Sequence, residues 1–144
     1  MNSRHYLSNL ITLMLLWFPF INTHAQTTLS PSDHCRNFSA DAIVSFADQD
    51  LAEVVNDALG LDSQAPLTCG QAAELEQLIV GTTIERVVYG GTLRPSPEKP
   101  FESLEGIQNL TGLTRLNLIN RLITDISPLR TLTNLVNLNL HTNW

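Results

Sequence analysis

The fold of this chain is decided by residues 101–140, which read FESLEGIQNLTGLTRLNLINRLITDISPLRTLTNLVNLNL. When this stretch is shifted by 22 residues against itself, apolar side chains fall on apolar side chains at seven positions. Neither the helical period of 3.6 residues nor the strict alternation of a strand produces this spacing. The chain therefore contains an internal repeat. The seven pairs are Phe101/Ile123, Leu104/Ile126, Ile107/Leu129, Leu110/Leu132, Leu113/Leu135, Leu116/Leu138 and Leu118/Leu140.

Each unit carries the pattern L-x-x-L-x-L, at residues 113–118 and again at residues 135–140. Leu116 and Leu118 are two residues apart, so both point to the same side of a short strand. The other apolar positions, from Ile123 to Leu132, recur every three residues, which predicts a tight 3₁₀-like or extended return segment. One such unit cannot bury its apolar side alone. We therefore expect stacked units around a shared core, as in a leucine-rich repeat.

The turn between the units, residues 123–129, reads I-T-D-I-S-P-L. This segment resembles the bacterial leucine-rich repeats of the internalin type, whose 22-residue units carry an I-x-D-I-S-P-L turn. The resemblance implies that Asp125 caps the turn. It also implies that an Asn three residues after the strand bonds to the turning backbone. Asn143 matches that Asn, but Arg121 takes its place one repeat earlier, beside Asn120, so we expect the Asn ladder to be broken or shifted there.

The resemblance also sets the expected architecture. It implies an α+β repeat fold, a short leucine-rich-repeat solenoid with parallel strands on its concave face and an α-helical N-terminal cap. We divide the chain into a signal peptide at residues 1–25, a helical cap at residues 26–82 and about two and a half repeats at residues 83–144. The first repeat is degenerate: Ile84, Val87 and Tyr89 share the strand spacing. A Pro-rich insertion follows, which we expect to bulge from the turn.

Residues 1–25 are typical of a secretion signal. A weakly basic start precedes an apolar run from Leu10 to Ile21, and Thr23 and Ala25 are small residues at a cleavage site before Gln26. The apolar run is short of the roughly 20 residues that span a bilayer. We expect no stable membrane span after cleavage, and a mature chain that is secreted, periplasmic or on the cell surface.

Composition excludes some function classes. The chain has 144 residues, of which 43% are hydrophobic, and a formal net charge of −6. This length and hydrophobic content are enough for one domain with a hydrophobic core. A nucleic-acid-binding protein would carry a basic patch, so we predict no nucleic-acid partner. The charge is uneven, at −9 over residues 26–105 and +2 over residues 106–144, which a solvated surface explains.

Two helices are expected in the region before the repeats. Asp48 can cap the first helix, and Gly60 ends it. Thr68 and Gln71 have capping-box spacing for the second, which we expect to run to Gly81. In the family such helices cover the first repeat, whose apolar end would otherwise face water. A partner-binding site on the helices is the alternative. The apolar faces consist of Leu51, Val54, Val55, Ala58 and Leu59 in the first helix and Ala72, Leu75, Leu78 and Ile79 in the second.

Cys35 and Cys69 are the two cysteines of the chain. In an exported protein an even number favours a disulfide, which would tie a flexible N-terminal segment, residues 26–38, to the second helix. Closing a loop of 34 residues would contribute on the order of 3 to 4 kcal/mol. Two free thiols are the alternative. A zinc site would need more ligands than His34 adds nearby. We predict no metal and no cofactor.

Catalytic motifs are absent from the sequence. It has no G-x-S-x-G, H-E-x-x-H, P-loop or C-x-x-C pattern. Two of the four histidines lie within the predicted signal, and His34 and His141 are far apart in the chain. We therefore predict that the protein is not an enzyme.

A binding face is the stronger hypothesis. Residues between the strand leucines point away from the core, and most of them are neutral amides, which suit a protein or glycan ligand better than a phosphate. In the resembled family this concave face recognises protein partners. Each residue taken alone could also be an ordinary solvated strand residue. The candidate binding residues are Arg115, Asn117, Ile119, Asn137, Asn139 and His141, preceded in the degenerate repeat by Arg86, Val88 and Gly90.

The predicted function is thus an exported, non-catalytic recognition module for a protein or glycan ligand. The alternative is an N-terminal structural or adhesive part of a larger surface protein or secreted enzyme. The repeats run to Trp144 without a closing turn, so we expect either a longer or truncated protein or an open strand edge. Such an edge can pair with a partner or self-associate.

Overall fold

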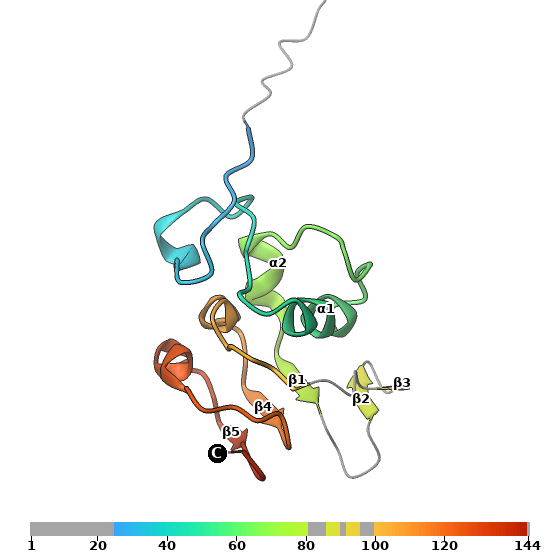
Figure 1. Cartoon of the computed structure of the whole chain (residues 1–144). Coiled ribbons are helices and arrows are strands. Elements are labelled where there is room, and N and C mark those ends of the chain that lie inside the picture. The colour runs from blue at the N-terminus through green and yellow to red at the C-terminus, as the bar shows by residue number, and fades with distance from the viewer. Residues whose placement is uncertain (1–24, 81–85, 90–91, 96–99, 144) are drawn as a thin grey trace, which may run out of the picture.

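The computed structural model describes residues 25–80, 86–89, 92–95 and 100–143 (Figure 1). The predicted signal peptide lies outside the described residues except for Ala25. Within the described part, no helix combines the length and apolar character needed to cross a membrane.

The central feature is a three-stranded parallel sheet with the order β1-β4-β5. Its strands are β1 (Gln77–Val80), β4 (Arg115–Leu118) and β5 (Asn137–Asn139). Leu116 of β4 lies opposite Leu138 of β5, so the register equals the 22-residue shift of the sequence repeat. Leu78 of β1 lies opposite Leu116 on the other side of β4. This sheet fits a short fold of the leucine-rich-repeat type.

The return segments form 3₁₀ helices, as the three-residue spacing predicts. They are η2 (Ile107–Asn109) and η3 (Ser127–Thr131), and they lie side by side (Figure 1). Asp125 caps the turn before η3: its Oδ1 accepts from the Ser127 backbone N–H at 2.8 Å and its Oδ2 from the Ser127 hydroxyl at 3.0 Å. One unit earlier, Ser103 Oγ accepts from the backbone N–H of Glu105 at 3.1 Å.

The core lies between the strands, the 3₁₀ helices and the N-terminal helices. Most of its apolar side chains from residues 101–118 are below 3% exposed. The second unit is covered less completely, since Ile126 is 52% and Leu138 is 49% exposed. The buried residues of the first unit are Phe101, Leu104, Ile107, Leu110, Leu113, Leu116 and Leu118.

The two N-terminal helices form close to their expected starts. In α1 (Gln49–Ala58) the carboxylate of Asp48 accepts from the backbone N–H of Leu51 at 3.1 Å, and its other oxygen accepts from that of Glu102 at 2.6 Å. A single carboxylate therefore caps α1 and joins it to the first repeat unit. The second helix, α2 (Cys69–Glu74), begins with the predicted capping box of Thr68 and Gln71. The helix α1 packs against β1 and β2.

The predicted extension of the second helix to Gly81 is wrong. The helix ends at Glu74, Leu75 is already extended with φ −73° and ψ 111°, and β1 begins two residues later. Ile79 and Val80 are β-branched and suit a strand. Parallel hydrogen bonding to β4, 38 residues further along the chain, then decides the conformation.

The predicted degenerate repeat strand is also wrong. β2 (Arg86–Tyr89) pairs antiparallel with β3 (Thr92–Pro95) in a separate two-stranded sheet. Ile84 lies outside the described residues. The strand that precedes β4 in the parallel sheet is β1, so this sheet begins before residue 83, where we placed the start of the repeats. The hairpin is part of an insertion between two consecutive strands of the sheet.

Candidate functional site

The candidate site is the face of the parallel sheet that points away from the core. We call it the sheet-face patch. Two rows cross it in register: one joins Gln77, Arg115 and Asn137, and the other joins Ile79, Asn117 and Asn139. Ile119 and His141 follow at the ends of β4 and β5, where the Asn120 backbone N–H donates to the His141 carbonyl at 3.0 Å. The sheet thus brings all six predicted binding residues onto neighbouring strands.

In β4 exposure alternates as a one-sided sheet requires, whereas all three residues of β5 are exposed. In β4, Leu116 and Leu118 are buried, Arg115 is exposed and Asn117 is half-buried. Asn137, Asn139 and His141 are exposed, and Ile119 is half-buried. One guanidinium, three amides and one imidazole from the predicted set therefore share one surface.

The two central amides differ in how they are held. Asn139 Oδ1 accepts from the His141 backbone N–H at 3.1 Å, which ties these two side-chain positions together. The covered Oδ1 of Asn117 has no hydrogen-bond partner among the described residues. An unpaired covered acceptor costs about 1 to 3 kcal/mol, and such groups call for a functional explanation. The Oδ1 of Asn117 is therefore an acceptor that the described fold does not use.

The polar groups on this surface are suited to hydrogen bonding. Amides supply both donors and acceptors, and Arg115 supplies a forked donor for a carboxylate. Among the described residues, no group of three or more His, Cys, Asp and Glu side chains is placed to hold a metal ion. These donors and acceptors lie in rows that cross the strands.

Two members of this surface were missed in the sequence. Gln77 and Ile79 occupy the β1 ends of the two rows, but we had assigned them to a helix. The signal was available: Leu75-x-x-Leu78-x-Val80 has the strand spacing of the later units. The helical spacing of Ala72, Leu75 and Ile79 concealed it. Of the residues expected from the degenerate repeat, Arg86 and Val88 lie in β2, outside the parallel sheet, and Gly90 lies outside the described residues.

Asn143 holds the turn beneath the patch. Its Oδ1 accepts from the backbone N–H groups of Arg121 at 3.0 Å and Ile123 at 3.1 Å. Its Nδ2 donates to the carbonyls of Leu118 at 2.7 Å and Leu140 at 2.8 Å. One side chain thus joins two consecutive units, as the resemblance implied for this position.

Arg121 takes a different role at the corresponding place one unit earlier. Its side chain is 6% exposed, and its guanidinium carbon lies 5.7 Å from the centre of the Phe101 ring. Its carbonyl accepts from the Phe101 backbone N–H at 3.0 Å. A buried cation–π contact and a backbone bond therefore close this turn, and the Asn ladder is replaced here as expected.

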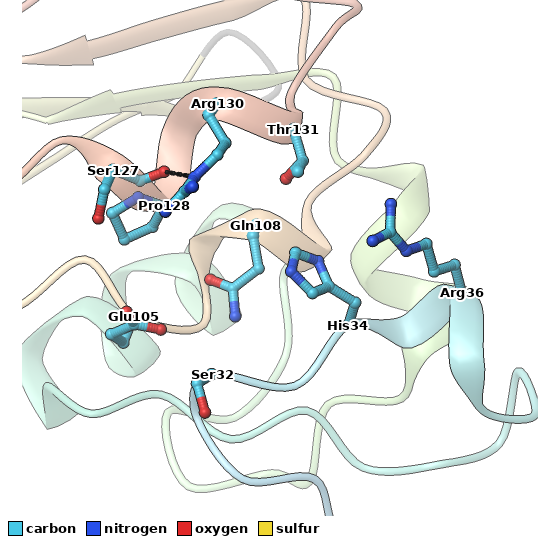
Figure 2. Close-up of a pocket in the computed structure, with 9 residues that line it drawn as sticks. All are labelled: Ser32, His34, Arg36, Glu105, Gln108, Ser127, Pro128, Arg130 and Thr131. Atoms are coloured by element: carbon cyan, nitrogen blue, oxygen red, sulfur yellow. Dashed lines mark hydrogen bonds between the residues drawn. The ribbon is translucent and has the colours of Figure 1, made fainter.

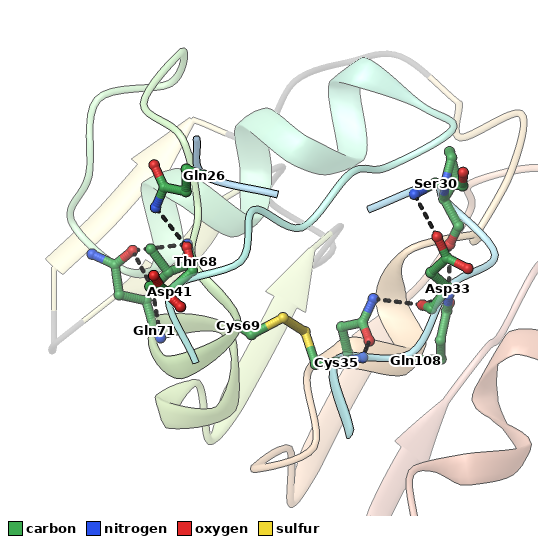
Figure 3. Close-up of a disulfide and its surroundings, with 11 residues drawn as sticks. Gln26, Ser30, Asp33, Cys35, Asp41, Thr68, Cys69, Gln71 and Gln108 are labelled. Atoms are coloured by element: carbon green, nitrogen blue, oxygen red, sulfur yellow. Dashed lines mark hydrogen bonds between the residues drawn. A yellow bond between two sulfur atoms is a disulfide. The ribbon is translucent and has the colours of Figure 1, made fainter. Parts of the chain in front are cut away.

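A disulfide joins Cys35 to Cys69, with a Cα–Cα distance of 5.5 Å (Figure 3). It connects the N-terminal segment to the first residue of α2. The same segment is held by Asn109, whose Oδ1 accepts from the Cys35 backbone N–H at 2.7 Å and whose Nδ2 donates to the Asp33 carbonyl at 3.0 Å. Gln108 Nε2 donates to the same carbonyl at 3.1 Å. Further upstream, Leu29 is 3% exposed and its backbone N–H donates to the Ile43 carbonyl at 2.8 Å. The expectation of a loose segment at residues 26–38 is therefore wrong for Leu29 and for Asp33 to Cys35.

Comparison with known proteins gives a structural likeness without a family assignment. No family model and no curated protein matches the chain. Similar solved structures include an internalin (inlF) from Listeria monocytogenes, with 31% identity and a TM-score of 0.53. That match covers 68% of this chain and 24% of the internalin chain.

Two further similar structures contain the CBM51-2 and INT domains of ZmpB from Clostridium perfringens. One has 20% identity and a TM-score of 0.52, and covers 69% of this chain and 18% of that chain. The other, in which CBM51-2 is in complex with GlcNAc, has 22% identity and a TM-score of 0.54, and covers 71% and 18%. The chain thus spans about a quarter or less of each matched protein. These likenesses support an internalin-like fold of the leucine-rich-repeat type for the matched part.

Proposed function

We propose that this protein is an exported, non-catalytic recognition module whose sheet-face patch binds a protein or glycan ligand. The observation that carries the proposal is the alignment of Arg115, Asn117, Asn137 and Asn139 in two registered rows on the exposed side of a parallel sheet. Such rows present several hydrogen-bonding groups at fixed spacing, so an extended polar ligand can bond to both strands at once.

Several observations support the remaining parts of the proposal. The disulfide and the internalin-like fold agree with a location outside the cytoplasm. The packing of α1 against β1 supports an N-terminal cap at the start of a short solenoid. The amide-rich patch, with a single imidazole at His141, supports a non-catalytic role. A GlcNAc complex among the similar structures is a reason to include glycans among the ligands tested.

A second candidate function is an N-terminal structural or adhesive module within a larger surface protein or secreted enzyme. The matched internalin and ZmpB chains are several times longer than the matched region, which favours this alternative. The two candidates differ in whether the patch itself captures a ligand.

The decisive experiment is capture of glycans and purified extracellular protein domains on arrays, using the full chain and the triple variant Asn117→Ala, Asn139→Ala, His141→Ala. These side chains are exposed or half-buried, so the variant should fold normally and lose capture by at least tenfold. A matched control replaces three exposed residues elsewhere, Asn37, Thr124 and Thr133, with Ala. If the triple variant retained capture while the control lost it, the assignment of the patch would be wrong. If neither array contained a ligand for the wild-type chain, the structural alternative would stand.

A further inference from the structure

We propose a second binding site on this protein, a pocket that takes a carboxylate-bearing sugar unit. The pocket has a volume of about 390 Å³ and lies between the N-terminal segment and the 3₁₀ helices η2 and η3 (Figure 2). It is formed by the return segments rather than by the strands, so it is separate from the sheet-face patch. We call it the arginine pocket; its argument rests on Ser32, His34, Arg36, Gln108, Arg130 and Thr131.

Cationic side chains gather in this pocket although the whole chain carries a net charge of −6. The structure describes the side chains of four arginines, and two of them, Arg36 and Arg130, line the pocket. Both are exposed, whereas Arg121 is buried against Phe101. His34 adds a third nitrogen-bearing group between them. With two arginines and one carboxylate, Glu105, the lining has a net positive charge, which favours a ligand that carries a negative group.

Arg130 is oriented for that role. Its Nε donates to the Ser127 carbonyl at 3.0 Å, within the same 3₁₀ helix (Figure 2). This bond restrains the guanidinium and uses only its Nε donor, so the two terminal nitrogens can donate to a ligand. A carboxylate accepts such a pair of parallel N–H donors in bidentate geometry.

The rest of the lining is polar, which suits the hydroxyl groups of a sugar. The covered Thr131 Oγ1 has no hydrogen-bond partner among the described residues. Gln108 is 3% exposed and both ends of its amide are engaged: its Oε1 accepts from the Gly106 backbone N–H at 2.8 Å, and its Nε2 donates to the Asp33 carbonyl at 3.1 Å. It therefore shapes the wall of the pocket and leaves the sugar contacts to its neighbours. The Ser32 hydroxyl lies on the side of the pocket opposite Thr131 and Arg130 (Figure 2). Pro128 is the apolar member of the lining. Ligand pockets commonly have volumes of about 300 to 1,000 Å³, so this pocket has room for one or two sugar rings.

Glu105 separates a sugar acid from a simple anion. It also lines the pocket, at the end away from Arg36 (Figure 2). A phosphate ion would be repelled by this carboxylate. A sugar acid can place its own carboxylate near the arginines and donate hydroxyl hydrogen bonds to Glu105. The combination of both charges in one pocket therefore fits a uronic or sialic acid better than an inorganic anion.

The disulfide holds one wall of the pocket in place. Cys35 lies between His34 and Arg36, and it is linked to Cys69 and bonded through its N–H to Asn109 Oδ1 at 2.7 Å. A wall that is fixed before binding loses less conformational entropy when the ligand enters. Reduction of the disulfide should therefore weaken binding in this pocket while leaving the sheet-face patch unchanged.

The test is isothermal titration calorimetry of the full chain with D-glucuronate, N-acetylneuraminate, D-glucose and inorganic phosphate. We expect at least one of the two sugar acids to bind, and glucose and phosphate to bind at least tenfold more weakly. Arg36→Gln and Arg130→Gln should each weaken binding about tenfold, since a hydrogen bond to a charged group is lost. Arg130→Lys should recover part of the affinity because it keeps the charge without the fork. Glu74→Gln removes an exposed charge outside both sites and is the matched control, which should leave binding unchanged. Arg115→Gln reports separately on the sheet-face patch.

Each other outcome would overturn the proposal. If glucose bound as tightly as the sugar acids, the ligand's carboxylate would not be needed for recognition. If phosphate bound as tightly, the pocket would be a general anion site. Sugar-acid binding that is lost in Arg115→Gln and kept in Arg36→Gln would place the ligand on the sheet-face patch instead. The Cys35→Ser, Cys69→Ser variant, checked for folding by circular dichroism, should bind several-fold more weakly; unchanged affinity would refute the role of the disulfide. The result does not depend on the sheet-face proposal, because the two sites share no residue.

Discussion

The two repeat units, residues 101–122 and 123–143, have the same apolar spacing but solve the same local problems with different polar residues. Ser103 and Asp125 both accept a backbone N–H two residues ahead. Arg121 closes one turn over Phe101, whereas Asn143 closes the next through hydrogen bonds. The apolar positions must match because the units share one core. The polar positions can differ because each depends on the neighbour that lies against it.

Gly112 and Asn134 occupy corresponding places just before β4 and β5, but they have different surroundings. Substitutions at these two positions should give the largest difference in the free energy of unfolding. A Cβ on Gly112 would clash with the Ala73 carbonyl oxygen, near the end of α2. Asn134, in the corresponding place, instead donates to the Thr111 carbonyl at 2.8 Å. Gly112→Ala should destabilise the protein by about 4 kcal/mol because backbone must move. Asn134→Ala should cost about 1 kcal/mol. Urea unfolding measures both, and equal losses would show that the close approach of α2 is not rigid.

Leu138 is the counterpart of Leu116 in the next repeat unit. Comparing the two leucines tests how unequally the units contribute to the core. Leu116 is 1% exposed and Leu138 is 49% exposed. Leu116→Ala should cost about 3 kcal/mol through the cavity it leaves. Leu138→Ala should cost less than about 1.5 kcal/mol, because half of that side chain already faces water. The same unfolding experiment decides it. A larger loss at Leu138 would mean that this face is covered in solution, for example by another chain.

Asn143→Ala should cost about 2 kcal/mol, because the Arg121 and Ile123 N–H groups lose their acceptor and the Leu118 carbonyl loses the Asn143 donor. Asn143→Asp is the sharper comparison, since it keeps the acceptor for Arg121 and Ile123 and loses the donors to Leu118 and Leu140. Hydrogen exchange of the Arg121 and Ile123 amides should rise strongly in the first variant and little in the second. Equal exchange in both variants would contradict the assignment of Asn143 as the link between the units.

The smallest effect is the pH response of Asp125. Backbone and side-chain hydrogen bonds from Ser127, with a smaller contribution from Arg130, hold the pKa of Asp125 below its usual value of 3.8. A lowered pKa in the folded state means that the ionised carboxylate stabilises the fold above about pH 4, and that this contribution is lost as the pH falls through the folded-state pKa. Carbon-13 NMR of the Asp125 carboxyl group should therefore give a midpoint below pH 3.8.

Ser103 and Asp125 cap corresponding turns, but only Asp125 can titrate. Ser103→Ala and Asp125→Asn therefore test whether the pH response belongs to the Asp125 turn alone. Asp125→Asn should lower the melting temperature slightly at pH 7 and not at pH 2, whereas the effect of Ser103→Ala should not change between these pH values. A midpoint at or above 3.8 would show that the Ser127 hydrogen bonds are not maintained in solution.

The repeat could be predicted from the sequence because its apolar residues recur at a constant interval of 22 residues. The shift that pairs Leu116 with Leu138 in the sequence is the register of β4 and β5 in the sheet. Six residues of the candidate site followed from that register. Gln77 and Ile79 did not, because the insertion between β1 and β4 breaks the period and the helical spacing continues through Leu75.

By itself, the sequence determined the spacing of the units, the apolar side of β4 and β5, the 3₁₀ return segments, the capping box of α2 and the one pairing open to its two cysteines. These features depend on neighbouring residues or on a regular shift. Only the tertiary structure decided that residues 77–80 are a strand, that Arg121 stacks on Phe101 and that Asp33 to Cys35 lie against Gln108 and Asn109. Each of these rests on contacts between segments 20 to 76 residues apart, whose free energy no local pattern contains.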